Sequence, residues 1–164
     1  MSNPRISTGE RARLDALMGI AQREAALLLQ TDGRLFASEF SATELPVLLE
    51  QPEFSERTDA FVARFGRLQD LLGDKWLPAW LRAMQEPLGA VLENLDRAEK
   101  LGLIDSADQW LAVRKLRNLM VHEYLDQPEA LYAALNSAHA GVPMLLQTVA
   151  RLGARTRLLI PPSA

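Results

Sequence analysis

Residues 114–124 gather most of the side chains in this chain that can carry out chemistry. The segment holds two arginines, an asparagine, one of the two histidines and one of the two tyrosines, namely Arg114, Arg117, Asn118, His122 and Tyr124. A guanidinium can bind a phosphate through two parallel hydrogen bonds, and an imidazole can transfer a proton near neutral pH. Metal-independent RNA cleavage needs both functions, because a base takes the proton from the ribose 2′-hydroxyl while a cation stabilises the charge on phosphorus.

The spacing of these residues predicts a helix with a polar side. At about 100° per residue, Arg114, Asn118 and His122 follow each other at four-residue steps and become neighbours. Arg117 and His122 are five residues apart and offset by about 140°, so they do not touch but can flank one bound group. The opposite arc is apolar and is expected to face a core; it consists of Val113, Leu116, Leu119 and Met120.

The motif Arg117-Asn-Leu-Met-Val-His122 resembles that of the HEPN domains, which have Arg, four to six residues, then His, often with a polar residue directly after Arg. Tyr124 extends the resemblance to the R-x4-H-x-Y form of HEPN toxins that pair with minimal nucleotidyltransferases. The motif covers eight residues, and the helical context extends from about residue 55 to residue 152. The first helix and residues 34–53 have no counterpart in the compact toxins.

The resemblance implies roles for these residues. His122 would be the proton-transfer residue and Arg117 the phosphate binder of an endoribonuclease, and Tyr124 would be the site where a partner nucleotidyltransferase attaches adenylate. HEPN domains usually pair as two-fold dimers with both motifs facing a shared cleft, so RNA, a second copy and a nucleotidyltransferase antitoxin are the expected partners.

Each residue also has a plainer interpretation. His122 can be a helix-terminal histidine that favours the C-terminal dipole, and Arg114 can pair with nearby carboxylates. Asn118 can hydrogen-bond the imidazole and fix its tautomer, or it can be a surface amide. Tyr124 is as consistent with packing as with function. His139 has no partner pattern in the sequence and is interpreted as structural.

The composition predicts one soluble domain. A chain of 164 residues with 48% hydrophobic content is large enough to bury a core. The absence of cysteine excludes disulfides and thiolate chemistry, and no histidine and carboxylate spacing is typical of zinc, so neither a metal nor a cofactor is expected. No apolar run is long enough for a membrane span or a secretion signal, and a cytoplasmic location follows by default.

The net charge of −3 and the pI near 5.4 argue against binding nucleic acid through an overall positive field. Two local basic groups remain, at residues 114–117 and 151–157. The second is interpreted as a solvated helix face.

Helical signals follow one another along the chain. Apolar periodicity, caps and breakers predict helices at about 8–29, 42–50, 56–72, 87–100, 106–122 and 128–152, with a helical turn or two from Asp74. Ser7 or Thr8 is expected to cap the first helix and Thr31-Asp-Gly33 to close it. Ser55 should cap the helix at 56–72, and Gly73 should end it. In the helix at 87–100, Leu88, Val91, Leu92 and Leu95 are expected to point inward, with Gly102 as the stop. Asp105-Ser106 is expected to cap the motif helix, and Phe36 and Phe40 to seat the segment after the first helix on the bundle. Residues 34–53 are read as a connecting segment and 158–164 as a frayed tail.

These elements predict an all-α up-and-down bundle of four main helices plus an N-terminal one, formed as a single domain by residues 1–164. The resemblance implies that this bundle is HEPN-like. Trp76, Trp80 and Trp110 offer more aromatic surface than one small bundle is expected to bury, which makes a dimer plausible.

Three functions remain open. The first is a metal-independent HEPN endoribonuclease acting as the toxin of a toxin–antitoxin pair. The second is a non-catalytic nucleotide-binding or accessory subunit for a minimal nucleotidyltransferase. The third is a helical interaction protein in which the motif is a coincidence.

Overall fold

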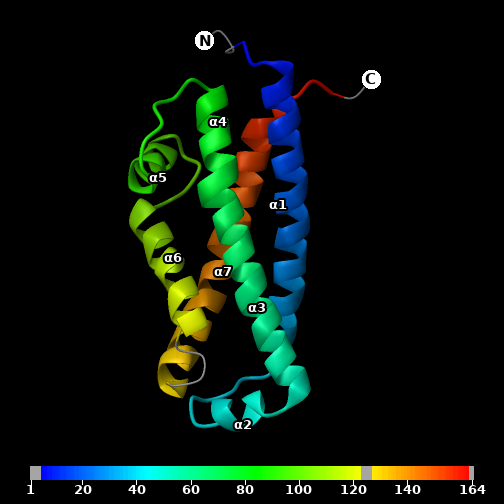
Figure 1. Ribbon diagram of the computed structural model, residues 1–164, viewed down its shortest axis with the longest axis vertical. Coiled ribbons are helices and arrows are strands. Elements are labelled where there is room, and N and C mark those ends of the chain that lie inside the picture. Colours follow the sequence, from blue (N-terminus) through cyan, green and yellow to red (C-terminus); the bar gives the residue numbers. More distant parts are fainter. Residues whose placement is uncertain (1–4, 123–126, 163–164) are drawn as a thin grey trace.

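A computed structural model of the chain describes residues 5–122 and 127–162 (Figure 1). These residues form helices and no strand, which confirms the all-α prediction. The elements are α1 (Thr8–Leu35), α2 (Leu45–Leu49), α3 (Pro52–Asp70), the π-helical turn η1 (Leu71–Trp76), α4 (Leu77–Ala83), α5 (Val91–Lys100), α6 (Ala107–His122) and α7 (Pro128–Arg157). None of the described helices combines the length and apolar character that crossing a membrane requires.

Four long helical segments lie side by side and run alternately down and up (Figure 1). They are α1, the continuous α3–η1–α4 segment, α6 and α7. Both ends of the chain lie at one end of the bundle, whereas α2, the end of α6 and the beginning of α7 lie at the other. The motif is therefore at the end of the molecule opposite the termini.

The first helix is longer than its sequence signals suggest. Thr31-Asp-Gly33 does not end it, because α1 continues to Leu35 and the amide of Phe36 donates to the carbonyl of Asp32 at 3.1 Å. Gly33 does not take a positive φ, so it is not a left-handed helix cap. Leu28 and Leu35 are both buried on the same side of α1, and the extension places Asp32 at a buried position as well.

The α3–η1–α4 segment also passes the expected stop at Gly73. α3 begins at Pro52, ahead of the predicted cap at Ser55, and continues into a π-helical turn in which the amide of Leu77 donates to the carbonyl of Leu72, five residues earlier. Pro78, which has no amide hydrogen, follows directly after this widened turn. The missing donor is thus tolerated where the regular helical ladder has already changed.

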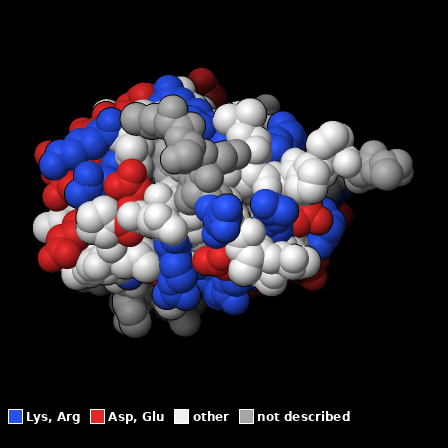
Figure 2. Space-filling model, turned by 90° about the horizontal axis from the view of Figure 1, so that it is seen from above, with Lys and Arg blue, Asp and Glu red and all other residues white. Residues whose placement is uncertain are grey.

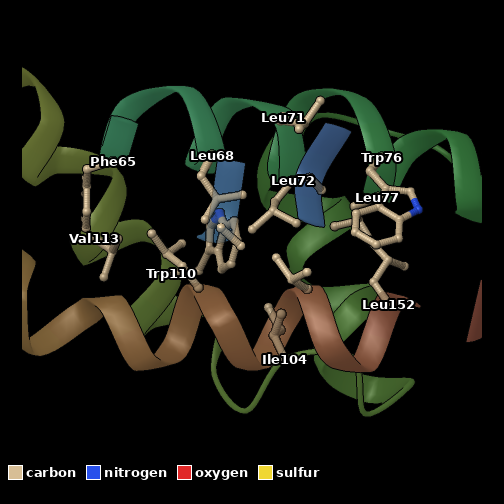
Figure 3. Packing of buried hydrophobic residues seen from close by; sticks show 14 of the residues in the cluster. Phe65, Leu68, Leu71, Leu72, Trp76, Leu77, Ile104, Trp110, Val113 and Leu152 are labelled. Atoms are coloured by element: carbon tan, nitrogen blue, oxygen red, sulfur yellow. The ribbon is translucent and has the colours of Figure 1, made fainter. Parts of the chain in front are cut away.

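All three tryptophans are buried within a single chain. Trp76, Trp80 and Trp110 have exposed fractions of 0%, 3% and 2%, and Figure 3 shows Trp76 and Trp110 among the leucines of neighbouring helices. The indole nitrogen of Trp76 donates to Thr156 at 3.1 Å, which satisfies it inside the core. Gly73 makes room for Trp110, since a methyl group there would lie 3.3 Å from the indole nitrogen. The expectation that the tryptophans exceed the capacity of one bundle is wrong.

Two further boundaries differ from the prediction. Leu88 and Leu92 were expected to point inward but are 41% and 50% exposed, whereas Leu95 is buried. α7 runs five residues beyond the expected end at 152, and Leu159 is buried within the segment expected to fray. By contrast, Gly102 ends α5 as predicted, because it takes a positive φ of 75° that favours glycine.

Candidate functional site

Residues 114–122 of the motif form the second half of α6, which packs against α3, α5 and α7. Ser106 caps this helix as predicted, accepting a hydrogen bond from the amide of Gln109 at 3.1 Å. Val113 and Met120 are buried, but Leu119 is 45% exposed, so its predicted place in the core is wrong. The core-facing side is centred closer to Val113 than to Leu116, and this rotation brings Arg117 toward α3.

Arg117 lies over Gly66 of α3. A methyl group on Gly66 would be 3.1 Å from Nε of Arg117, so this glycine provides the space in which the guanidinium crosses between the helices. Beyond Gly66, Nη1 of Arg117 pairs with a carboxylate oxygen of Asp70 at 2.5 Å. The Arg117 side chain remains 44% exposed, and the Asp70 side chain 37%. The guanidinium is therefore bound within the chain and still accessible to a ligand.

Arg114 makes a parallel pair one turn earlier along α6. Its Nη1 lies 3.2 Å from a carboxylate oxygen of Asp74, and both side chains are about 40% exposed. The plainer interpretation of Arg114, pairing with a carboxylate, is thus observed. Exposed ion pairs of this kind contribute only about 0–1 kcal/mol. Replacing either carboxylate by a phosphate would therefore cost the fold little.

The remaining motif residues are described to different extents. Asn118 is exposed, and its side chain has no hydrogen bond to another described residue. His122 is the last helical residue of α6, and its imidazole is outside the described part of the structure, as is Tyr124. The predicted contact between Asn118 and the imidazole and the role of Tyr124 therefore stay predictions.

The second basic group is used for structure. Arg151 pairs with Asp105 at 2.7 Å, and Arg155 donates to the carbonyl of Leu101 at 3.0 Å, so both fasten α7 to the segment between α5 and α6. Figure 2 shows that, at the end of the molecule carrying the termini, basic side chains are interspersed with acidic and uncharged ones. The sequence predicted a solvated helix face here, whereas Arg151 and Arg155 contact the segment between α5 and α6.

A second cluster of polar groups surrounds His139, which sequence reasoning left without a partner. Nδ1 of His139 lies 2.6 Å from a carboxylate oxygen of Asp32, whose side chain is only 12% exposed. The imidazole stacks on Phe36 with ring centres 4.1 Å apart and an angle of 21° between the planes. The side chain of His139 is 44% exposed, so its ring is held on two sides and open on the rest.

This histidine lines a pocket of about 460 Å³ between the end of α1 and the first turns of α7. The walls are Phe36, Ser38, Glu39, Phe40, Tyr132, Asn136 and His139. Ligand sites in proteins commonly measure about 300–1,000 Å³. The cavity is thus large enough for a small organic molecule.

No known protein family, curated protein or solved structure matches this chain.

Part of the pocket could have been recognised in the sequence. Tyr132, Asn136 and His139 follow i, i+4, i+7 spacing, which places them on one face of a helix. The partner of the histidine could not, because Asp32 is 107 residues away and stands in a segment that reads as a helix stop.

Among the described residues, no group of three or more histidines and carboxylates is placed to hold a metal ion. Away from both clusters, hydrogen bonds with the backbone and hydroxyl of Ser7 lower the pKa of Glu10 in the capping box of α1.

Proposed function

We propose that this chain is a metal-independent endoribonuclease of the HEPN type and the toxin component of a toxin–antitoxin pair. The observation that carries the proposal is the exposure of the Arg117 guanidinium and its weak surface pairing with Asp70. The guanidinium is 44% exposed, one and a half turns before His122, and is held by a carboxylate that is itself 37% exposed. A phosphate can displace Asp70 there, because a guanidinium binds phosphate in two-point fashion and the surface pair it gives up is weak.

In this mechanism a dimer brings two copies of His122 to one cleft. The imidazole of one copy takes the proton from the ribose 2′-hydroxyl. The resulting alkoxide attacks the adjacent phosphorus and the bond from phosphorus to the 5′-oxygen breaks. The departing 5′-oxygen takes a proton from the protonated His122 of the second copy, and a 2′,3′-cyclic phosphate remains. Arg117 stabilises the charge that develops on the phosphoryl oxygens. The motifs of two copies facing each other would supply two arginines and two histidines to one cleft.

The experiment is RNA cleavage by the purified chain in EDTA, with the product ends identified. Wild type should give 2′,3′-cyclic or 3′-phosphate ends, and Arg117→Ala should reduce cleavage by about 10²–10³-fold, since it removes the group that stabilises the charged oxygens. Arg97→Ala is the matched control, because Arg97 is a 37%-exposed arginine that pairs with Glu86 at 3.8 Å away from the motif. Less than a tenfold loss in Arg117→Ala, or a strict requirement for Mg²⁺, would exclude this mechanism.

A second candidate is the accessory subunit without catalysis. The pairing of both motif arginines with Asp70 and Asp74 favours it, because four side chains that neutralise one another need no RNA to be satisfied. In that case Asp70→Asn, which frees Arg117 without removing it, would still give no cleavage in EDTA. The helical interaction protein remains the third possibility and predicts no nuclease activity and no nucleotidyltransferase partner.

Assembly and control follow from the same proposal. We expect a two-fold dimer in which the α6 helices face each other, and the exposed Leu119 and Val121 beside the motif provide apolar surface for such a contact. Light scattering that shows a monomer at tens of micromolar would exclude the dimer. Tyr124 is the expected adenylation site, and co-expression with a neighbouring nucleotidyltransferase should add the mass of AMP to its tryptic peptide in wild type but not in Tyr124→Phe.

A further inference from the structure

The pocket around His139 has aromatic walls that serve two purposes. Phe36 packs edge-on against the buried Phe61 with ring centres 5.4 Å apart, and Phe40 packs in the same way against Phe54 at 5.3 Å. These contacts are sufficient to hold residues 36–40 on the bundle, as the plainer reading of the two phenylalanines requires. Phe36, Phe40 and Tyr132 are nevertheless only partly buried, so each also presents ring surface to the pocket.

Several polar groups of the pocket can accept hydrogen bonds. One N–H of Asn136 Nδ2 donates to the carbonyl of Tyr132 at 2.9 Å, and Oδ1 of Asn136 can accept a hydrogen bond from a ligand. A carboxylate only accepts, so Nδ1 of His139 donates to Asp32, and Nε2 is the ring nitrogen that remains open to a ligand. Glu39 adds an exposed carboxylate.

The charged residues at the pocket also favour a cationic ligand. None of the described residues lining the pocket is a lysine or an arginine, whereas Glu39 is acidic and Asp32 lies directly behind the imidazole. A phosphate or carboxylate could accept hydrogen bonds from the hydroxyls of Ser38 and Tyr132, but it would meet the Glu39 carboxylate without a lysine or arginine among these lining residues to offset the repulsion. The faces of aromatic rings carry partial negative charge and attract cations.

We infer that this pocket binds a small organic cation rich in N–H donors, of the guanidinium or alkylammonium class. A guanidinium is planar, stacks on aromatic faces and presents five donors, which suits the ring surfaces together with the acceptor oxygens of Glu39 and Asn136. The buried carboxylate of Asp32 sets the orientation of the imidazole and thereby the direction of Nε2. The inference does not depend on RNA cleavage, since none of these residues belongs to the α6 motif.

The experiment is calorimetric titration of the full chain with agmatine, followed in parallel by the imidazole signals in NMR. The chain has only two histidines, so His139→Gln assigns the second signal, and we expect agmatine to shift the resonances of His139 and not those of His122. Urea is the neutral probe that keeps the donors without the charge, and AMP is the anionic probe. Saturable binding of agmatine, with at least tenfold weaker binding of urea and AMP, is the expected result.

Two variants test the recognition chemistry. Glu39→Gln should weaken agmatine binding about tenfold or more, because a hydrogen bond to a charged group becomes one to a neutral group. Glu50→Gln is the matched control, since Glu50 is an exposed glutamate at the end of α2 that does not line the pocket. N-acetylarginine amide distinguishes the source: binding as tight as agmatine indicates the arginine side chain of a polypeptide, whereas much weaker binding indicates a free diamine-like cation.

The inference would be overturned by three results. One is no agmatine binding at tens of millimolar, the second is equal affinity in wild type and Glu39→Gln, and the third is tighter binding of AMP or urea. All three are read from binding alone, so they are independent of the outcome of the RNA cleavage assay.

Discussion

The two histidine regions of this chain differ in what the rest of the fold does for them. At the α6 motif, Arg117 and Arg114 pair with Asp70 and Asp74 through side chains that are all about 40% exposed. On α7, His139 pairs with Asp32, whose side chain is 12% exposed, and stacks on Phe36. The first arrangement is loosely held at the surface, and the second is positioned by a buried carboxylate.

The two regions therefore represent two kinds of candidate site, one contiguous in the sequence and one assembled by the fold. The α6 motif is dense in sequence, and its arginines can exchange partners because surface ion pairs contribute little. The His139 cluster is dispersed in sequence and is assembled by the fold, because its residues come from the end of α1, the segment after it and α7. A buried carboxylate and a stacked ring restrict the imidazole to one orientation, as a binding site requires.

The largest expected effect is a double dissociation between the two histidines. His122→Gln should lose about 10²–10⁴-fold of RNA cleavage in EDTA, the usual contribution of proton transfer, and keep agmatine binding. His139→Gln should lose agmatine binding and keep cleavage within about threefold of wild type. The assays are those already described, with circular dichroism as the control for folding. Loss of both activities in both variants would mean that the two regions form one site and would remove the distinction.

The next effect concerns stability. Asp32→Ala should lower the free energy of unfolding by about 1.5–3 kcal/mol, because it removes the nearly buried carboxylate that accepts a hydrogen bond from Nδ1 of His139. Asp70→Ala should lower it by only about 0–1 kcal/mol, since its pair with Arg117 is exposed. Urea unfolding of the two variants beside wild type measures both. An equal loss in the two variants would show that the α6 pair is as firmly integrated as the α7 pair.

Which elements exist could be predicted from the sequence, but their boundaries and rotations could not. Apolar periodicity and caps such as Ser7 and Ser106 are local signals, and both caps are observed. Gly33 and Gly73 are also local stop signals, yet the helices pass through them because burial on neighbouring helices outweighs the propensity of a single residue. A glycine fits at position 73 because the indole of Trp110 packs against it, and Trp110 lies 37 positions later in the chain.

The candidate sites illustrate the same limit. The types and order of residues in the α6 motif could be read directly, but the place of Arg117 over Gly66 depends on how α6 is rotated in the bundle. That rotation, set by Val113 and Met120 rather than by Leu119, decides which carboxylate the guanidinium meets. The contact between His139 and Asp32 required both the extension of α1 and the packing of α1 on α7.

A smaller effect is expected from releasing Arg117. Asp70→Asn keeps the shape of the side chain but removes its charge, so RNA no longer competes with a carboxylate for the guanidinium. Affinity for a short single-stranded RNA should rise by up to about fivefold, the equivalent of a surface pair of up to about 1 kcal/mol. Fluorescence anisotropy at low salt measures it, with Glu86→Gln, which releases Arg97 instead, as the control. Unchanged or weaker binding in Asp70→Asn would argue that Arg117 does not contact RNA.

The smallest effect tests the extension of α1 that brings Asp32 to His139. Gly33 lies inside α1, is exposed, has no positive φ, and has open space around the position of an added methyl group. Gly33→Ala should therefore stabilise the chain by about 0.5–1 kcal/mol, because alanine loses less conformational entropy than glycine in a helix. Gly102→Ala provides the contrast, since its φ of 75° is unfavourable for alanine and the variant should be less stable than wild type. If urea unfolding shows that Gly33→Ala is also destabilised, α1 ends at Gly33 in solution, and the carboxylate of Asp32 is not held against His139 by a continuous helix.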